Sequence, residues 1–239
     1  MNLPIGTIKT KSLLAACAIA LLFTVTSCST TEHARSVTES GFLGDYSQLK
    51  PGKEAKLVYV DRSVDWNKYH AVYIEPVELW HSDDPDSKLG KLSQEDQELL
   101  VNFFYTSLHT NLARDFHLAD QRGPDVLVIH CAITEAKKSR PVANLVTTII
   151  PYGRAANLAK KVVFGSGVGV GEAQVEGEFL DGATGQRIAA VVDRRVGTKA
   201  LRSKFDGTWG DVKRIMDYWS EHLDERMVEL RKEYKKSGQ

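Results

Sequence analysis

Two long stretches of the sequence carry apolar residues at helical spacing, so each must pack one side against another part of the chain. The first follows Ser93 and the second runs from Trp209 to Tyr234. Their apolar positions are Leu99, Leu100, Phe103, Phe104, Leu108, Leu112 and Phe116, and Val212, Ile215, Met216, Trp219, Leu223, Met227 and Leu230. Ser93 predicts the start of the first helix, because a hydroxyl N-cap followed by Glu95 and Asp96 stabilises a first turn. One-sided helices require a second layer.

Segments rich in Val, Ile and Tyr predict the strands of that layer. They are residues 55–60, 70–77, 125–136, 171–181 and 186–195. The connection DGATG, residues 181–185, predicts a hairpin turn in which Gly185 adopts a positive φ. These elements together predict an α+β fold, a two-layer α/β sandwich with a mostly antiparallel sheet and both main helices on one face.

The link between two of these strands, residues 140–173, is a long apolar insertion. Connections of this length are uncommon in compact domains and often functional. Residues 154–164 within it show the pattern of an amphipathic helix. Three roles fit this pattern: packing on the sheet face that carries Val128 and His130, contact with a partner, or contact with a membrane. The residues expected in a partner or membrane contact are Leu145, Ile149, Ile150, Tyr152, Leu158, Val162, Val163 and Phe164.

The N-terminus has the form of a secretory signal peptide. Lys9 and Lys11 precede the apolar run LLAACAIALLFTV, residues 13–25, and small polar residues follow it. As a helix this run would be about 20 Å long, whereas a hydrocarbon core is about 30 Å thick. The pattern therefore favours a cleaved leader over a permanent transmembrane helix.

The end of this run resembles a lipobox, the processing site of bacterial lipoproteins. Val25 and two small residues precede Cys28. The resemblance implies that residues 1–27 are a signal peptide and that Cys28 is lipidated with acyl chains such as palmitate. It also implies that Ser29 sorts the protein to the outer membrane of a Gram-negative cell. Two or three acyl chains are enough for stable anchoring.

The polar residues 28–40 show no periodicity and predict a lipidated flexible tether. We expect residues 41–239 to form a single periplasmic α/β domain. The stretch GFLGDYSQLKPG, residues 41–52, places apolar side chains between glycines and is typical of a segment that docks on a domain and covers an edge of its core.

Cys131 is the only thiol left once the leader is removed and Cys28 is acylated, so no intramolecular disulfide can form. It alternates with apolar residues in a predicted strand, which favours a buried, unreactive cysteine.

The composition offers no electrostatic reason to expect a nucleic-acid partner. The chain has 239 residues, with 31 basic and 31 acidic side chains. Its seven histidines lack metal-ligand spacing, and the run GSGVGVG, residues 165–171, departs from the dinucleotide fingerprint at Val170. The sequence therefore predicts no nucleic acid, no cofactor, no metal site and no enzymatic activity. The stretch 193–195 (DRR) is interpreted as a surface ion-pair cluster.

Four parts of the sequence together resemble one known protein family. They are the lipobox, SGFLGDYSQLKPG (40–52), the strand that ends at Asp181 before Thr184 and Gly185, and AAVVDRRVG (189–197). Over residues 40–235 the chain resembles the bacterial lipoprotein family catalogued as domain of unknown function 3313. The resemblance implies an envelope location and no mechanism. More loosely, the element order is similar to small α/β domains of envelope assembly proteins, including the lipoprotein of the curli secretion channel.

We therefore expect a membrane-anchored lipoprotein on the periplasmic face of the outer membrane, with a non-enzymatic binding or assembly role in the cell envelope. Its partners would be the membrane, through the lipid anchor, and another envelope protein or a second copy of the chain. Two alternatives stay open. One is an oligomeric channel or secretion subunit in which residues 140–173 rearrange on the membrane, and the other is an envelope hydrolase with a cleft that holds an acid–base pair.

Overall fold

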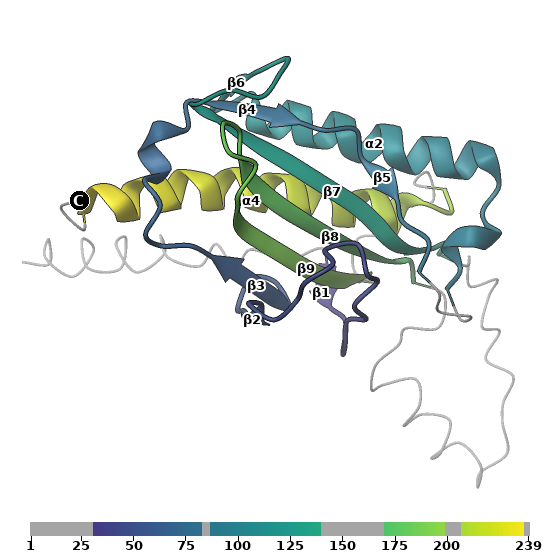
Figure 1. Ribbon diagram of the computed structural model, residues 1–239. Coiled ribbons are helices and arrows are strands. Elements are labelled where there is room, and N and C mark those ends of the chain that lie inside the picture. The colour runs from purple at the N-terminus through teal and green to yellow at the C-terminus, as the bar shows by residue number, and fades with distance from the viewer. Residues whose placement is uncertain (1–30, 83–86, 140–169, 199–206, 237–239) are drawn as a thin grey trace, which may run out of the picture.

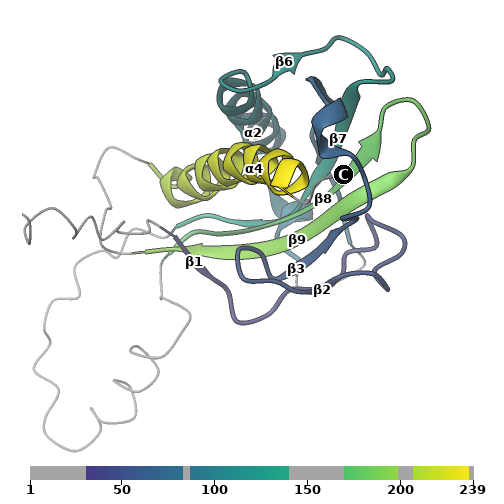
Figure 2. The same ribbon diagram turned by 90° about the vertical axis from the view of Figure 1, so that its left-hand side faces the viewer.

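The computed structural model describes residues 31–82, 87–139, 170–198 and 207–236. Within these ranges two long helices, α2 (Gln94–Leu112) and α4 (Gly210–Lys236), lie side by side on one face of a nine-stranded sheet (Figures 1 and 2). This arrangement confirms the predicted α+β fold with both main helices on one face.

The sheet runs in the order β2-β3-β9-β8-β7-β4-β6, and β1 pairs with β9 while β5 pairs with β7. Its strands are β1 (Thr31–His33), β2 (Lys50–Pro51), β3 (Leu57–Val60), β4 (Ala71–Ile74), β5 (Glu78–Leu79), β6 (His117–Leu118), β7 (Val126–Lys137), β8 (Glu172–Asp181) and β9 (Arg187–Gly197). The pairs of β4 with β6 and β7, and of β5 with β7, are parallel, and the remaining pairs are antiparallel. The sheet is therefore mixed but mostly antiparallel.

The start of α2 follows from its capping residues. Ser93 accepts a hydrogen bond from Asp96 N at 3.3 Å, which satisfies one of the free N–H groups of the first turn. The Asp96 carboxylate in turn accepts from Lys138 Nζ at 2.7 Å and from Trp209 Nε1 at 2.7 Å. These hydrogen bonds, with that of Lys138 the largest cause, lower the pKa of Asp96 to about 2. One carboxylate thus joins the first turn of α2 to the end of β7 and the start of α4.

The main core lies between the two helices and the sheet. Leu100 of α2 and Ile215 of α4 are fully buried, and Phe104 packs against Trp219 with ring centroids 6.0 Å apart. The sheet contributes alternate residues of β7, namely Leu127, Ile129, Cys131 and Ile133. Burying an aliphatic side chain of this size contributes about 1.5–3 kcal/mol.

Two details differ from the sequence prediction. The predicted strand 70–77 is shorter in the structure, where β4 ends at Ile74 before Pro76, which cannot donate a ladder hydrogen bond. The separate strand β5 begins after the predicted range. Phe116, placed on the first helix by its spacing, lies beyond the end of α2 at Leu112 but is still buried in the core.

The hairpin between β8 and β9 forms as predicted. Gly185 has a φ of 71°, which favours glycine. Asp181 accepts hydrogen bonds from the backbone N–H groups of Ala183 and Thr184 at 3.1 and 2.9 Å. Its other oxygen accepts from the Tyr69 hydroxyl at 2.9 Å. The turn is thereby fastened to the segment that follows the short helix η1 (Trp66–Lys68).

The predicted flexible tether over residues 28–40 is wrong for its described part. Thr31 to His33 form β1, which pairs antiparallel with the end of β9. Ala34 N continues the pairing with a hydrogen bond to Arg194 O at 2.8 Å. A polar stretch was expected to stay solvated, but here its backbone groups find partners on a sheet edge.

Candidate functional site

The sheet face opposite the helices is crossed by residues 34–49, which we call the strap. Leu43 of the strap is buried against Ala190 and Val192 of β9. Strap residues Val37, Phe42, Tyr46 and Leu49 pack around this contact. The segment 41–52 therefore docks on the domain, as predicted. It packs in a small cluster on this sheet face rather than at an edge of the main core, and Lys50–Pro51 form β2.

β8 holds the strap through a row of polar side chains that alternate along it. These are Glu172, Gln174, Glu176 and Glu178. Gln174 accepts from Thr38 N at 3.2 Å and donates to Thr38 O at 2.7 Å. Glu176 accepts from Ser40 N at 2.9 Å. The backbone groups of β8 are already paired with β7 and β9. The backbone of the strap is therefore hydrogen-bonded by the side chains of β8 instead of by its backbone.

Glu176 is fully buried, and the Tyr46 hydroxyl is its second donor, at 2.5 Å. The same hydroxyl oxygen accepts from Gly41 N at 2.9 Å and Leu43 N at 3.3 Å. Burial is the largest cause of the raised pKa of Tyr46, and the hydrogen bond to Glu176 adds to it. The hydroxyl therefore stays protonated and links three parts of the site.

The conformation of the strap explains the Gly-Phe-Leu-Gly sequence. Gly41 and Gly44 have φ values of 90° and 69°, a region where a side chain is strained. The turn between them directs carbonyl groups towards Arg187, which donates to Asp45 O at 2.9 Å and to Leu43 O at 2.5 Å. Arg187 also pairs with Glu178 at 2.7 Å, so its guanidinium fastens the strap to β8.

An aromatic contact covers His130 on β7. The rings of Phe42 and His130 lie 4.7 Å apart, and Phe42 meets Trp80 edge-on at 5.5 Å. His130 is held between Glu178 and Glu78, each at 2.9 Å. Burial by itself lowers the pKa of His130, but the hydrogen bonds to the two carboxylates outweigh it, and the net shift is upward. The protonated form is favoured under the strap.

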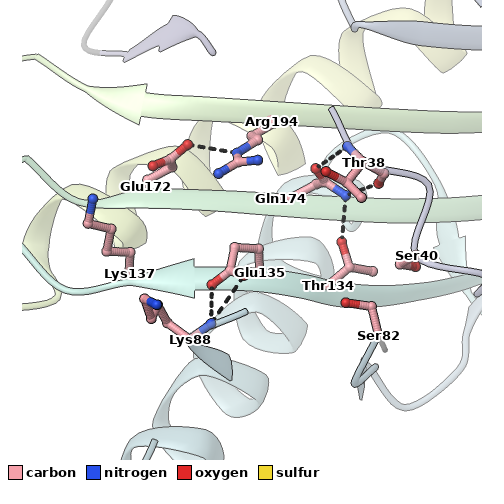
Figure 3. Close-up of a pocket in the computed structure, with 10 residues that line it drawn as sticks. All are labelled: Thr38, Ser40, Ser82, Lys88, Thr134, Glu135, Lys137, Glu172, Gln174 and Arg194. Carbon is pink, nitrogen blue, oxygen red and sulfur yellow. Dashed lines mark hydrogen bonds and ion pairs between the residues drawn. The ribbon is translucent and has the colours of Figure 1, made fainter. Parts of the chain in front are cut away.

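A polar pocket of about 350 Å³ opens where the strap crosses the ends of β7 and β8 (Figure 3). Its lining is Thr38, Ser40, Ser82, Lys88, Thr134, Glu135, Lys137, Glu172, Gln174 and Arg194. Gln174 also donates to Thr134 Oγ1 at 3.0 Å. Arg194 donates to Glu172 at 2.7 Å, and Glu135 accepts from Lys88 N at 3.1 Å. The pocket is charged and hydroxyl-lined, which suits a small polar group.

The interpretation of residues 193–195 as a surface cluster is wrong for two of the three. Asp193 and Arg195 are buried on the helix face of β9, and Arg194 alone points to the strap face. Asp193 accepts from Trp219 Nε1 at 2.8 Å and contacts His33 Nδ1 at 3.0 Å. The helix α4 covers them, with Trp219 lying 26 residues after Asp193, and the charges of a short stretch of sequence do not indicate such cover.

Arg195 fastens β1 to the domain. Its Nε donates to Thr31 Oγ1 at 2.7 Å and a terminal nitrogen donates to Thr31 O at 3.2 Å. Its guanidinium lies over the Tyr218 ring at 3.8 Å. The first strand of the chain is therefore held by buried side chains as well as by its ladder.

Cys131 is buried in the helix-facing core, as predicted. Burial raises the pKa of its thiol to about 12. A thiol in that state is unreactive at neutral pH.

Other predicted site residues lie outside the described ranges. These are Cys28, Ser29, Leu145, Ile149, Ile150, Tyr152, Leu158, Val162, Val163 and Phe164. Within the described ranges, no cluster of His, Cys, Asp or Glu has the arrangement of a metal site. No helix in those ranges is both long and apolar enough to cross a bilayer.

The sequence prediction missed the polar row of β8 and the pocket beside it. A signal was present, because Glu172, Gln174, Glu176 and Glu178 alternate with residues of the apolar core. Alternation of this kind marks a strand with one polar side. It does not reveal whether water or another segment covers that side.

A family model described as "Protein of unknown function (DUF3313)" matches residues 38–223. The chain belongs to this family. The DUF3313 match begins within the strap and includes the strap contacts made by Thr38, Ser40, Leu43 and Tyr46. No curated protein matches the chain.

Several solved structures are distantly similar in fold. A PelC variant from Paraburkholderia phytofirmans, solved as a dodecamer, is 13% identical; the match covers 66% of this chain and 88% of that one, with a TM-score of 0.36. A minor lipoprotein from Acinetobacter baumannii is 11% identical, with 68% and 95% covered and a TM-score of 0.33. The hypothetical protein CT253 from Chlamydia trachomatis is 12% identical, with 70% and 94% covered and a TM-score of 0.30. Similarity of this strength carries no functional information.

Proposed function

We propose that this DUF3313 protein is a lipoprotein of the bacterial cell envelope with a non-enzymatic binding or assembly role. Residues 1–27 are its signal peptide, Cys28 carries the acyl chains, and Ser29 directs it to the periplasmic face of the outer membrane. The main support for a role at the membrane is the short stretch of chain between Cys28 and β1. Only two residues separate Cys28 from Thr31, where the sheet begins.

Three residues of chain reach at most about 11 Å. β1 is held by its ladder to β9 and by Arg195, so the chain does not lengthen by unwinding without losing buried contacts. A domain acylated at Cys28 therefore lies directly against the lipid headgroups. Such a position suits a protein that binds or assembles at a membrane surface.

The proposed partners are the membrane, through the anchor, and another envelope protein or a second copy of the chain. The long insertion leaves and re-enters the sheet at Lys137 and Glu172, which are paired across β7 and β8. Glu172 in turn faces Val196, the residue that pairs with Glu32 of β1. The insertion is thus connected to the sheet at the proposed anchored end, which supports a role for it in contact with a partner or with lipid.

The anchor is tested by metabolic labelling with an alkyne fatty acid and by intact mass. The wild-type chain is expected to carry acyl chains on a new N-terminal cysteine, and Cys28→Ser to carry none. Density-gradient fractionation is expected to find the wild type in the outer membrane and Ser29→Asp in the inner membrane. A wild-type chain without acyl groups would overturn the proposal.

The binding role is tested by cross-linking and pulldown of the lipidated protein from membranes. Deletion of residues 142–164 is expected to remove a specific partner, whereas Trp80→Ala, at an exposed strap contact, leaves that partner bound. An unchanged set of partners after the deletion would exclude the insertion from the binding surface.

A further inference from the structure

The polar pocket lies at the end of the sheet that is nearest to Cys28. Glu32, Val196, Glu172 and Lys137 form one line across β1, β9, β8 and β7. Neighbouring strands are about 4.8 Å apart, so Glu172 in the pocket lies about 10 Å from Glu32 across the sheet. The hairpin turn at the other end of β9 is about 30 Å away, at about 3.3 Å per residue.

The charges that line the pocket are only partly compensated. Glu172 and Arg194 form an ion pair at 2.7 Å. The Glu135 carboxylate accepts from the backbone N–H groups of Lys88 and Ala136, at 3.1 and 3.2 Å. In Figure 3 the Gln174 hydrogen bonds lie towards one side of the pocket, and Glu172 and Lys137 lie towards the other.

Two ammonium groups of the lining are not neutralised by a carboxylate of the described residues. Within the described part of the chain, neither the Lys88 nor the Lys137 ammonium has a hydrogen bond or ion pair. Both side chains are exposed. Ser82 adds a hydroxyl that can donate to the same ligand. Two ammonium groups and a hydroxyl in one concavity are the groups that bind a phosphate oxygen.

We propose that this pocket binds the phosphate of a membrane phospholipid. The inference rests on the proposed acylation of Cys28, because the short connection to β1 places the pocket within reach of the headgroup layer. Lys88 and Lys137 contact the phosphate oxygens. The acidic lining, Glu135 and Glu172, disfavours a ligand that carries several negative charges and suits a headgroup with one phosphate.

The test uses the full-length chain, processed in a Gram-negative host and transferred to nanodiscs of phosphatidylethanolamine and phosphatidylglycerol. Native mass spectrometry then counts phospholipids retained by the acylated chain. The double variant Lys88→Glu and Lys137→Glu is compared with Lys232→Glu and Lys235→Glu, which makes the same change of charge near the far end of α4. Circular dichroism checks that all three chains are folded.

The wild type and the control pair are expected to retain one phospholipid. The pocket variant is expected to retain phospholipid at least about tenfold less well. Each lysine beside an anionic headgroup raises the affinity several-fold, and reversing its charge adds repulsion. Equal retention by all three chains would overturn the proposal. In a parallel arm with inorganic phosphate, a phosphate adduct without any lipid adduct would identify a free anion as the ligand and also overturn it.

The covalent mass separates this inference from the proposed function. A chain without acyl groups contradicts the lipoprotein proposal and, with it, the membrane source of the ligand. An acylated chain that retains no phospholipid contradicts the pocket proposal alone.

Discussion

The hydroxyl of Tyr46 donates its hydrogen bond to Glu176, a carboxylate that is fully buried on β8. The two residues are 130 positions apart, and their contact closes the strap over the sheet. Ser40 N supplies another donor to the same carboxylate at 2.9 Å. Ser40 N and, at 3.4 Å, Gln174 Nε2 both donate to Oε1. Among the described residues the Tyr46 hydroxyl is the donor to Oε2, so that buried oxygen has no other donor if the hydroxyl is lost.

Tyr46→Phe is expected to destabilise the fold by about 1–3 kcal/mol, because it leaves a buried acceptor short of a donor. The two backbone N–H groups of Gly41 and Leu43 lose their acceptor as well. Urea unfolding measures the loss. Tyr59→Phe is the matched control, since within the described residues the Tyr59 hydroxyl has no hydrogen bond although its ring packs in the same cluster. Equal effects of the two substitutions would contradict the role of the Tyr46 hydroxyl.

His130 is expected to make stability depend on pH in a defined direction. Its pKa is raised in the folded state, so the stabilisation from the protonated ring is complete below about pH 6.5 and is lost as the pH rises through the folded pKa. The loss is at most about 1.4 kcal/mol per pH unit for one proton. His130→Asn is expected to flatten this part of the profile. A wild-type profile with the opposite slope would show that Glu78 and Glu178 do not stabilise the imidazolium.

The main helices and the long strands were predictable because their signals are local. The apolar spacing of α2 and α4, the Ser93 cap and the Gly185 turn each depend on residues within a few positions. The burial of Cys131 followed from alternation within a single strand. Such patterns need no knowledge of the partner segment.

The predictions of a flexible tether and of a surface cluster at Asp193 and Arg195 were wrong for the opposite reason, because the contacts involved are not local. β1 has three residues, and buried side chains such as Arg195 help to hold it. Asp193 is covered by Trp219 of α4, which is far along the chain. Contacts of this range leave no mark on the composition of either segment. The polar row of β8 was visible as alternation, but the segment that covers it was not.

Asp224 of α4 lies beside Asp115, which follows the end of α2. Burial first, and then repulsion from Asp115, raise the pKa of Asp224 to about 6. Above that pH the charged form costs stability, and stability is recovered as the pH falls through about 6 towards the unfolded value near 3.8. Asp224→Asn is therefore expected to stabilise the protein at pH 7.5 by about 1–2 kcal/mol. The gain is expected to disappear in acid, and a variant less stable than the wild type at neutral pH would contradict the repulsion.

Gly197→Ala is expected to disturb the junction between β9 and α4. A Cβ atom at Gly197 would lie 2.6 Å from Asp211 Cγ and 2.7 Å from its Cβ, well inside contact distance. Asp211 is buried in the first turn of α4 and accepts from Gly171 N at 2.7 Å, so it cannot move aside without losing that bond. Overpacking of this kind costs about 1–3 kcal/mol. Gly90→Ala is the control, because its nearest neighbour would be His81 Nδ1 at 3.8 Å. Thermal unfolding compares the two, and an unchanged midpoint for Gly197→Ala would mean that α4 begins farther from the sheet than the structure places it.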